Sequence, residues 1–212
     1  MMDVKEAYNE WADQYDTNDN KTRDTEAKAK KEILNEINFE RCLEIGCGTG
    51  KNTEWLSQKA MHITAVDLSE EMLAKAKQKI KSDHVTFVQA DIRENWDFAK
   101  DKYNLVTFSL VLEHIDQIEP IIQKAADALA DNGYLYIGEL HPFKQYSGSK
   151  ARFTSEDGEK VVACYNHHIS DFTEAARKAG LKAELIKEYF DMDDRNSLPR
   201  IICFLFKKDA SR

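Results

Sequence analysis

Several features that would place a chain in a specialised class are missing from these 212 residues. No apolar stretch approaches the roughly 20 residues that a membrane-spanning helix needs, so we expect no membrane association. The opening residues, MMDVKEAYNEW, lack the apolar core of a signal peptide. The four cysteines show no CxxC spacing, which argues against a zinc site or a disulfide framework. These absences predict a cytoplasmic protein with reduced thiols and no bound metal.

Positive charge is also in deficit. The chain has 38 acidic residues against 30 lysines and arginines, a net charge of −8. Nucleic-acid binding draws much of its affinity from neutralised phosphates, so this balance argues against DNA or RNA as a partner. The composition, 42% hydrophobic and 32% charged, fits a soluble globular protein. The length predicts a single domain over residues 1–212, as a monomer or homodimer.

Strands and helices alternate along the chain, which predicts an α/β fold with a doubly wound, mostly parallel sheet. The second predicted helix carries apolar residues at helical spacing, and Ser69 can cap the fourth. Asn132-Gly133 is a typical helix stop. We expect helices over 4–16, 22–37, 50–59, 69–80 and 117–130, and strands over 41–46, 62–67, 85–90, 103–111 and 134–140.

The last third of the chain departs from this alternation. Residues 141–168 are too long for a routine connection and are rich in aromatic residues and histidines, so we expect a substrate lid there. A helix then runs from a Ser170 cap to Gly180. The strand-like runs 183–190 and 200–208 are separated by nine residues that leave no room for a helix. They should therefore pair as an antiparallel hairpin.

Residues 42–53, CLEIGCGTGKNT, place three glycines in five positions directly after an apolar run. A phosphate-binding P-loop would need glycine at position 45 and serine or threonine at position 52, where this chain has Ile45 and Asn52. The dinucleotide-binding pattern GxGxxG would need glycine at position 51, which is Lys51. The turn therefore suits a ligand other than a nucleotide phosphate.

The remaining pattern is an acidic residue followed by alternating glycines, and it resembles motif I of the class I S-adenosylmethionine-dependent methyltransferases. Three further stretches resemble that family in order and spacing: DLSEEMLAKAK (67–77), QADI (89–92) and SLVLEHI (109–115). The resemblance covers about residues 41–140 and is nearest to the broad methyltransferase type 11 group. S-adenosylmethionine carries a sulfonium cation and no phosphate, so acidic groups and backbone carbonyls suit it.

This resemblance implies a Rossmann-like fold of seven strands and S-adenosyl-L-methionine as the cofactor. In the family, the acid at the place of Asp67 binds the ribose hydroxyls, and residues matching Leu68 and Met72 border the adenosine. Asp91 would accept the adenine amino group, and the amide of Ile92 would contact a ring nitrogen. The implied cofactor-binding residues are Tyr15, Glu44, Gly46, Cys47, Gly48, Gly50, Asp67, Leu68, Met72, Asp91, Ile92 and Ser109.

The N-terminal stretch YNEWADQYD (8–16) resembles the opening of many small-molecule methyltransferases, in which an aromatic-rich helix lies over the cofactor. Tyr8, Trp11 and Tyr15 recur at helical spacing, so one face is aromatic. Such a face could stabilise a sulfonium by a cation–π interaction of about 1 kcal/mol. The alternative is a helix that packs on the sheet edge. We treat residues 1–38 as a helical cap on the core at 41–140.

The mechanism implied by the family is direct displacement at the methyl carbon, so the protein mainly orients the acceptor and excludes water. A general base is needed only when the acceptor must lose a proton. The candidate catalytic residues are His114, His141, His167 and His168, since neutral imidazole is a competent base near pH 7. Glu113 and Tyr15 are the further possibilities.

Acidic charge, short length and the lack of an added domain favour a small-molecule methyl acceptor. Two alternatives stay open. The chain could be a catalytically silent module that binds S-adenosylmethionine or S-adenosylhomocysteine. A nicotinamide-linked dehydrogenase is disfavoured by the GxGxG spacing and by the motif at 89–92.

Overall fold

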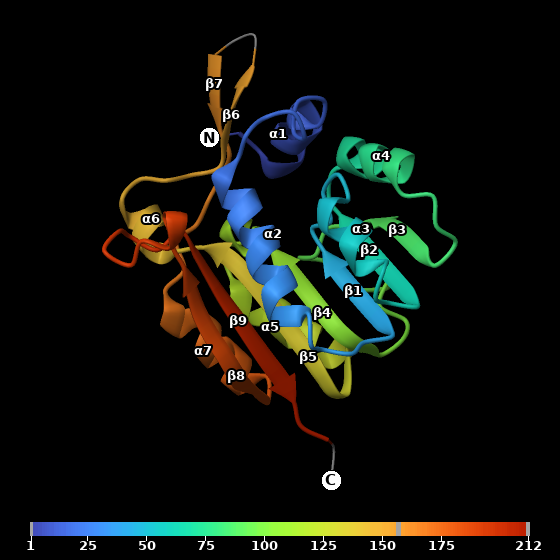
Figure 1. Ribbon diagram of the computed structural model, residues 1–212. Helices are drawn as coiled ribbons and strands as arrows, with labels where there is room; N and C mark the ends of the chain where they lie inside the picture. Colours follow the sequence, from blue (N-terminus) through green and yellow to red (C-terminus); the bar gives the residue numbers. More distant parts are fainter. Residues whose placement is uncertain (1, 156–157, 211–212) are drawn as a thin grey trace.

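A seven-stranded sheet forms the centre of the protein (Figure 1), whose computed structural model describes residues 2–155 and 158–210. The strand order is β3-β2-β1-β4-β5-β9-β8, and β9 alone runs antiparallel to its neighbours in this sheet. This confirms the predicted fold class. The strands are β1 Arg41–Ile45, β2 His62–Asp67, β3 Val85–Gln89, β4 Tyr103–Ser109, β5 Leu129–Leu140, β8 Leu181–Tyr189 and β9 Ile201–Lys208.

Helices cover both faces of the sheet, as the alternation predicts. The core on one face joins α5 and α7 to the strands, and the core on the other face contains residues of α2, α3 and α4. Figure 1 shows α2 lying across β5 and β9. The helices are α1 Val4–Trp11, α2 Lys21–Leu34, α3 Lys51–Leu56, α4 Glu70–Lys79, α5 Ile118–Ala128, α6 Pro142–Tyr146 and α7 Ile169–Lys178, with 3₁₀ turns at η1 Leu112–His114 and η2 Asp191–Asp193.

The point where the strand order reverses lies between β1 and β4. From β1 the chain continues outward through β2 and β3, and then returns to place β4 on the other side of β1. In open sheets of this kind, ligands bind in the crevice at the carboxyl ends of the strands beside such a reversal. The glycine-rich turn after β1 and the segment after β4 both lie at this position.

Three predicted helix boundaries are corrected by the structure. Helix α1 ends at Trp11 instead of residue 16, and the chain continues in tighter turns in which the Trp11 carbonyl accepts the Gln14 N–H and the Gln14 carbonyl accepts the Thr17 N–H. Helix α7 is capped by His168 instead of Ser170, and the Asp171 carboxylate accepts the His168 N–H at 2.7 Å.

The third correction concerns the predicted stop at Asn132-Gly133. Helix α5 already ends at Ala128, and β5 begins at the next residue. Asn132 adopts a left-handed conformation, with φ 61°, inside β5. The pairing with β4 therefore skips residues, from Tyr103 opposite Leu129 to Leu105 opposite Tyr134.

The segment 141–168 contains α6 and a small hairpin of β6 Arg152–Ser155 and β7 Gly158–Val161, while its residues 156–157 lie outside the described residues. The hairpin packs on the N-terminal segment. The Phe153 and Trp11 rings stack with centroids 5.1 Å apart, and the Met2 N–H donates to the Val161 carbonyl. The division of the chain into cap, core and lid stays a prediction.

Candidate functional site

The principal cavity lies at the carboxyl ends of β1, β2, β3 and β4, and α1 lies over it. The glycine-rich turn, the ends of β2 and β3, and the segment after β4 form its walls. Eight of the twelve predicted cofactor-binding residues line it: Tyr15, Gly46, Gly48, Asp67, Leu68, Asp91, Ile92 and Ser109. Residues from far apart in the chain thus meet in one cavity, as the motifs predict.

The three motif glycines have different tasks, although all have positive φ, at +71°, +53° and +84°. A Cβ on Gly46 would lie 2.1 Å from Cγ2 of Val111, so the close approach of the segment after β4 requires glycine there. A Cβ on Gly50 would lie 2.9 Å from Cδ1 of Ile80 in the turn after α4. Nothing lies within 4 Å of a Cβ on Gly48, which faces the cavity. Gly48 therefore leaves open space for a ligand.

Asp67 is held in place by the backbone. Its Oδ2 accepts the Gly48 N–H at 2.8 Å, and its Oδ1 accepts the Ser69 N–H at 2.8 Å. Burial raises the pKa of Asp67 above its usual value, and these N–H groups oppose that shift. Carboxylate oxygens keep further acceptor sites after one hydrogen bond each. Asp67 can therefore accept hydroxyl donors from a ligand in the cavity.

Replacing Asp67 with alanine is expected to weaken S-adenosylhomocysteine binding about tenfold or more, because hydrogen bonds to a charged carboxylate contribute about 1.5–3 kcal/mol. Isothermal titration calorimetry measures this. Asp13→Ala is the matched control, since Asp13 is exposed, pairs with Lys75 and lies outside the cavity. Equal affinity in the parent and in a folded Asp67→Ala variant would contradict the ribose-binding role.

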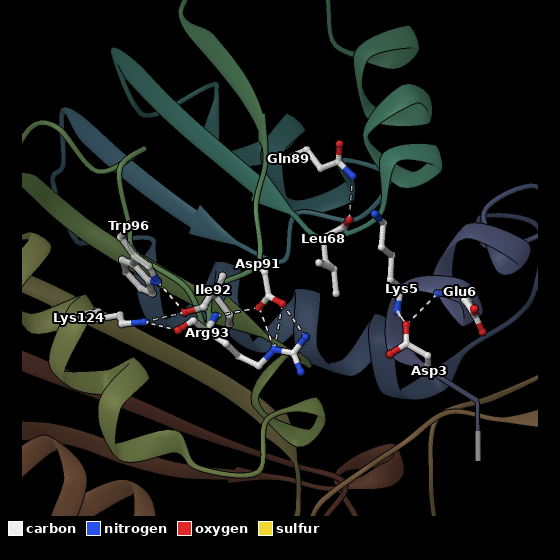
Figure 2. Close-up of polar contacts among 10 residues, drawn as sticks. All are labelled: Asp3, Lys5, Glu6, Leu68, Gln89, Asp91, Ile92, Arg93, Trp96 and Lys124. Atoms are coloured by element: carbon white, nitrogen blue, oxygen red, sulfur yellow. Dashed lines mark hydrogen bonds and ion pairs between the residues drawn. The ribbon is translucent and has the colours of Figure 1, made fainter.

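The adenine side of the predicted site contains an ion pair that the motifs do not show. Figure 2 shows Arg93 folded back onto Asp91, with Nη2 2.6 Å from Oδ2 and Nε 3.0 Å from Oδ1. This hydrogen-bonded pair lowers the pKa of Asp91 and keeps it a carboxylate. The carbonyl of Ile92 accepts the Trp96 indole N–H at 2.9 Å. Asp91 and Ile92 are thus fixed at the cavity wall.

Sequence reasoning did not assign a role to several residues of this cavity. Arg93 lies two residues after Asp91, and Val111 follows β4. Asp3 and Lys5 reach the cavity from the start of α1, and Figure 2 shows them facing Leu68 and Asp91. The one sequence signal that could have indicated Arg93 is its position two residues after the acidic Asp91.

Four predicted cofactor residues, Glu44, Cys47, Gly50 and Met72, lie behind the cavity wall. Glu44 is buried and accepts the Thr53 hydroxyl at 2.6 Å, and burial raises its pKa to about 7. Cys47 is a buried free thiol. Met72 is fully buried in a cluster that includes Trp11 and Phe153. These positions support the residues that line the cavity, and their direct contact with a cofactor stays a prediction.

Among the four candidate histidines, His114 lines the cavity and the other three do not. His141 is fully buried, and its Nε2 lies 3.0 Å from the Glu188 carboxylate. The buried Nε2 of His167 lies 2.7 Å from the Ile115 carbonyl, so it holds the chain just after η1. His168 is exposed at the start of α7 and bonds the Tyr146 hydroxyl. The geometry favours structural roles for these three side chains.

The protonation of His114 follows from its partners. Its Nδ1 lies 2.8 Å from the Ala163 carbonyl oxygen, which can only accept, so Nδ1 carries the proton. Its Nε2 lies 2.8 Å from the Tyr8 hydroxyl. Burial raises the pKa of Tyr8 well above its usual value, so Tyr8 remains protonated and donates to Nε2. His114 Nε2 is therefore a proton acceptor beside the cavity.

A second cavity adjoins the first and shares Tyr8, Tyr15 and Leu110 with it. It lies between α1, the start of α2 and residues 149–152, where the chain enters β6. Tyr8 lines both cavities and bonds His114. The Tyr8–His114 pair thus stands at the junction of the two spaces.

The backbone segment that carries His114 is held by a buried carboxyl. Glu139 Oε1 accepts the N–H groups of Val111 and Leu112, at 3.0 and 2.8 Å. Burial raises the pKa of Glu139 to about 8, and the nearby Glu113 carboxylate adds to the shift. Because its pKa in the folded protein exceeds the unfolded value of about 4.3, its contribution to stability is complete at low pH. That contribution is lost as the pH rises through about 8.

We therefore expect the free energy of unfolding to fall between about pH 5 and pH 8 more steeply in the parent than in Glu139→Gln. The difference should reach at least about 1.4 kcal/mol, which is the equivalent of one pKa unit. Urea unfolding at several pH values measures it. Glu184→Gln is the control, since Glu184 is exposed on β8. Parallel pH profiles for the parent and Glu139→Gln would contradict the buried-carboxyl account.

The strand order, the glycine turn after β1 and the acid after β2 define the class I S-adenosylmethionine-dependent methyltransferase fold, with S-adenosylmethionine as its cofactor. Comparison with known proteins agrees, because residues 43–137 match the family described as methyltransferase domain. This match and the shared fold support the resemblance drawn from the sequence.

The solved structures most useful for comparison cover nearly the whole chain. A putative S-adenosylmethionine dependent methyltransferase from Listeria monocytogenes superposes with a TM-score of 0.73 and 24% identity, over 88% of this chain and 99% of that one. The DhpI–SAH complex gives a TM-score of 0.74 and 24% identity, over 97% and 94% of the two chains. These likenesses show the fold, including the helical segment before β1.

The curated relatives are longer than this chain. A malonyl-[acyl-carrier protein] O-methyltransferase of Priestia megaterium is 27% identical over 77% of this chain and 56% of its own length. A ubiquinone biosynthesis O-methyltransferase of Hydrogenovibrio crunogenus is 30% identical over 66% and 61%. The chain thus spans less than two thirds of these relatives.

No helix within 2–155 and 158–210 is long and apolar enough to cross a membrane. The same residues hold no cluster of three or more histidine, cysteine or acidic side chains placed to bind a metal ion.

Proposed function

We propose that this protein transfers a methyl group from S-adenosylmethionine to a small-molecule acceptor by direct in-line displacement. The observation that carries the proposal is the pair of adjoining cavities, which share Tyr8, Tyr15 and Leu110. One cavity is lined by the residues that the family uses for the cofactor. The other is available to an acceptor, and the shared wall brings the two ligands next to each other.

The residues of the first cavity fit the cofactor. The hydroxyl of Ser109 is buried on the cavity wall and has no partner among the described residues, so a ligand can supply one. Gly48 leaves open space, and Asp67 presents a fixed carboxylate. Asp67 would hold the ribose and Asp91 the adenine amino group. S-adenosylmethionine, when bound, supplies an activated methyl group.

The chain's own residues orient the acceptor and remove its proton. Tyr8 is fixed by His114, so its ring and hydroxyl limit the poses available at the junction. Where the acceptor atom carries a proton, His114 Nε2 accepts it, either directly or through the Tyr8 hydroxyl. The aromatic rings of Tyr8, Trp11 and Tyr15 exclude water from this region.

Two measurements test the proposal. Isothermal titration calorimetry should show that both S-adenosylmethionine and S-adenosylhomocysteine bind, whereas NAD, the negative control, should not. Transfer of a labelled methyl group to a panel of small metabolites should give at least one methylated product. Binding without any transfer would support the silent binding module instead, and the absence of binding would contradict the proposal outright.

A cytoplasmic location, the monomeric or homodimeric state and the absence of nucleic-acid and membrane partners remain predictions from the sequence.

A further inference from the structure

The second cavity is basic, although the chain carries a net charge of −8. Among the described residues, four cationic side chains and one carboxylate, that of Glu113, line it. The cations come from the start of α2, from the segment that leads into the hairpin, from the first residue of β6 and from the residue before β9: Arg23, Lys150, Arg152 and Arg200. Positive charge is thus gathered at one place in a protein that is acidic overall.

Two of these cations already have carboxylate partners. The Arg200 guanidinium pairs with Asp191, with Nη2 2.6 Å from Oδ2. Arg152 lies 3.5 Å from the Glu159 carboxylate. Their charge is therefore largely balanced within the protein.

Arg23 and Lys150 form no ion pair with a carboxylate in the described part of the chain. The two terminal nitrogens of Arg23 donate to the backbone carbonyls of Tyr15 and Asn18, and its guanidinium lies over the Tyr15 ring, 4.0 Å from the centroid. Lys150 is exposed at the cavity rim. These two side chains bring positive charge to the cavity wall without a carboxylate at ion-pair distance, although the Asp16 carboxylate, which pairs with Lys79, also interacts with the Arg23 charge.

Three buried polar atoms of the cavity-lining residues also lack a hydrogen-bond partner within residues 2–155 and 158–210. They are Nε of Arg23, the indole Nε1 of Trp11 and Oε2 of Glu113. Trp11 is only 4% exposed, because one face of its ring stacks on Phe153. Buried polar atoms are almost always hydrogen-bonded, so their gathering on one cavity indicates a ligand that completes them. Two of the three are donors, and an oxyanion accepts from both.

Resting on the proposed function, we propose that the methyl acceptor is a small organic anion, whose carboxylate or phosphate-type oxyanion binds to Arg23, Trp11 and Lys150 in the second cavity. The guanidinium Nε–H, the indole N–H and the ammonium group supply charge-assisted and neutral hydrogen bonds to that oxyanion. A hydroxyl or amine elsewhere on the same molecule donates to Oε2 of Glu113. A neutral acceptor would leave Arg23 without an ion pair and its buried Nε–H unpaired, which is unfavourable.

Nuclear magnetic resonance of the tryptophan indole groups tests the oxyanion site directly. The chain has three tryptophans, so the ¹H–¹⁵N spectrum contains three indole peaks, and Trp11→Phe identifies one of them. We expect inorganic phosphate or sodium acetate to shift the Trp11 peak saturably and to leave those of Trp55 and Trp96 in place. Sodium chloride at equal ionic strength and glycerol should shift none of the three. The response to phosphate against acetate separates a phosphate-type group from a carboxylate.

Substitutions of Arg23 and Lys150 test whether these cations bind the anion that shifts the Trp11 peak. Arg23→Gln should raise the dissociation constant of the shifting anion at least about tenfold, and Lys150→Gln about threefold. Lys150→Gln guards against loss of folding, because Lys150 is exposed and makes no ion pair with a described residue. Arg177→Gln is the matched control, since Arg177 is exposed on α7 and pairs only with Glu174 in the described structure. Lys150→Gln and Arg177→Gln should bind S-adenosylhomocysteine as the parent does.

The outcomes separate this inference from the function on which it rests. A Trp11 peak that ignores both anions, or methyl transfer confined to neutral acceptors, overturns the anionic acceptor and leaves the methyltransferase intact. Failure of S-adenosylhomocysteine to bind overturns the proposed function itself. A Trp11 shift that is lost in Arg23→Gln, together with methylation of acids in the metabolite panel, supports the inference.

Discussion

Replacing His114 with alanine is expected to slow methyl transfer by about 10²-fold or more, with little change in S-adenosylhomocysteine affinity. General-base catalysis commonly contributes about 10²–10⁴-fold, and His114 is the one candidate histidine that lines the cofactor cavity. Because Nδ1 is committed to the Ala163 carbonyl, Nε2 carries the lone pair, which accepts the Tyr8 hydroxyl in the absence of substrate. Turnover of the acceptor found in the metabolite panel, with calorimetry alongside, measures both quantities. Tyr8→Phe should show a smaller loss if the proton passes directly.

His168→Ala is a matched control for this experiment. His168, like His114, bonds a tyrosine hydroxyl, but it is exposed and lines neither of the two adjoining cavities. Its replacement should leave turnover within about twofold of the parent, as is usual for surface substitutions away from a site. If His114→Ala and His168→Ala both turn over like the parent, His114 is a structural residue and Glu113 becomes the next candidate base.

Gly46→Ala is expected to have the largest effect on stability. A Cβ there would lie 2.1 Å from Val111 Cγ2, and the residue has φ +71°, which costs a non-glycine residue about 1–2 kcal/mol. Overpacking adds about 1–3 kcal/mol, so we expect a loss of at least 2 kcal/mol in the free energy of unfolding. Urea unfolding measures this loss. Cofactor affinity should fall as well, because Val111 and Gly46 both line the cavity.

Alanine variants at two other glycines distinguish the cost of backbone strain from the cost of a steric clash. Gly148 has φ +91° and no atom within 4 Å of an added Cβ, so Gly148→Ala should show the strain alone. Gly48 is equally open but faces the cofactor cavity, so Gly48→Ala should lower S-adenosylhomocysteine affinity more than stability. Equal stability of Gly46→Ala and Gly148→Ala would show that Val111 moves aside without cost.

The sequence predicted the fold well because its signals are local. The strands of the sheet alternate with amphipathic helices, and the nine-residue gap before β9 predicted the antiparallel hairpin that the structure shows. Helix ends were predicted less well. The Asp171 carboxylate, rather than the Ser170 side chain, completes the cap of α7, and i→i−3 turns replace the last predicted turn of α1. Such local hydrogen bonds leave no periodic signal in the sequence.

The candidate site also has a part that the sequence predicted and a part that it did not. The sequence by itself determined the cofactor cavity, because each of its motifs follows a parallel strand, and the carboxyl ends of such strands meet at one edge of the sheet. The motifs also singled out Met72 and Cys47, which the structure places behind the cavity wall. A motif gives the position of a residue along the chain but not the depth at which its side chain lies.

Only the tertiary structure decided the second cavity. More than a hundred residues separate Arg23 from Lys150, and β6, β7, α7 and β8 lie between Lys150 and Arg200. No local sequence pattern therefore relates these three residues. They meet because the hairpin of β6 and β7 packs on the N-terminal segment through Phe153 and Trp11, and because β9 returns between β5 and β8. The positive side chains of the second cavity come together through long-range packing against the sheet. No local pattern in the sequence therefore predicts them.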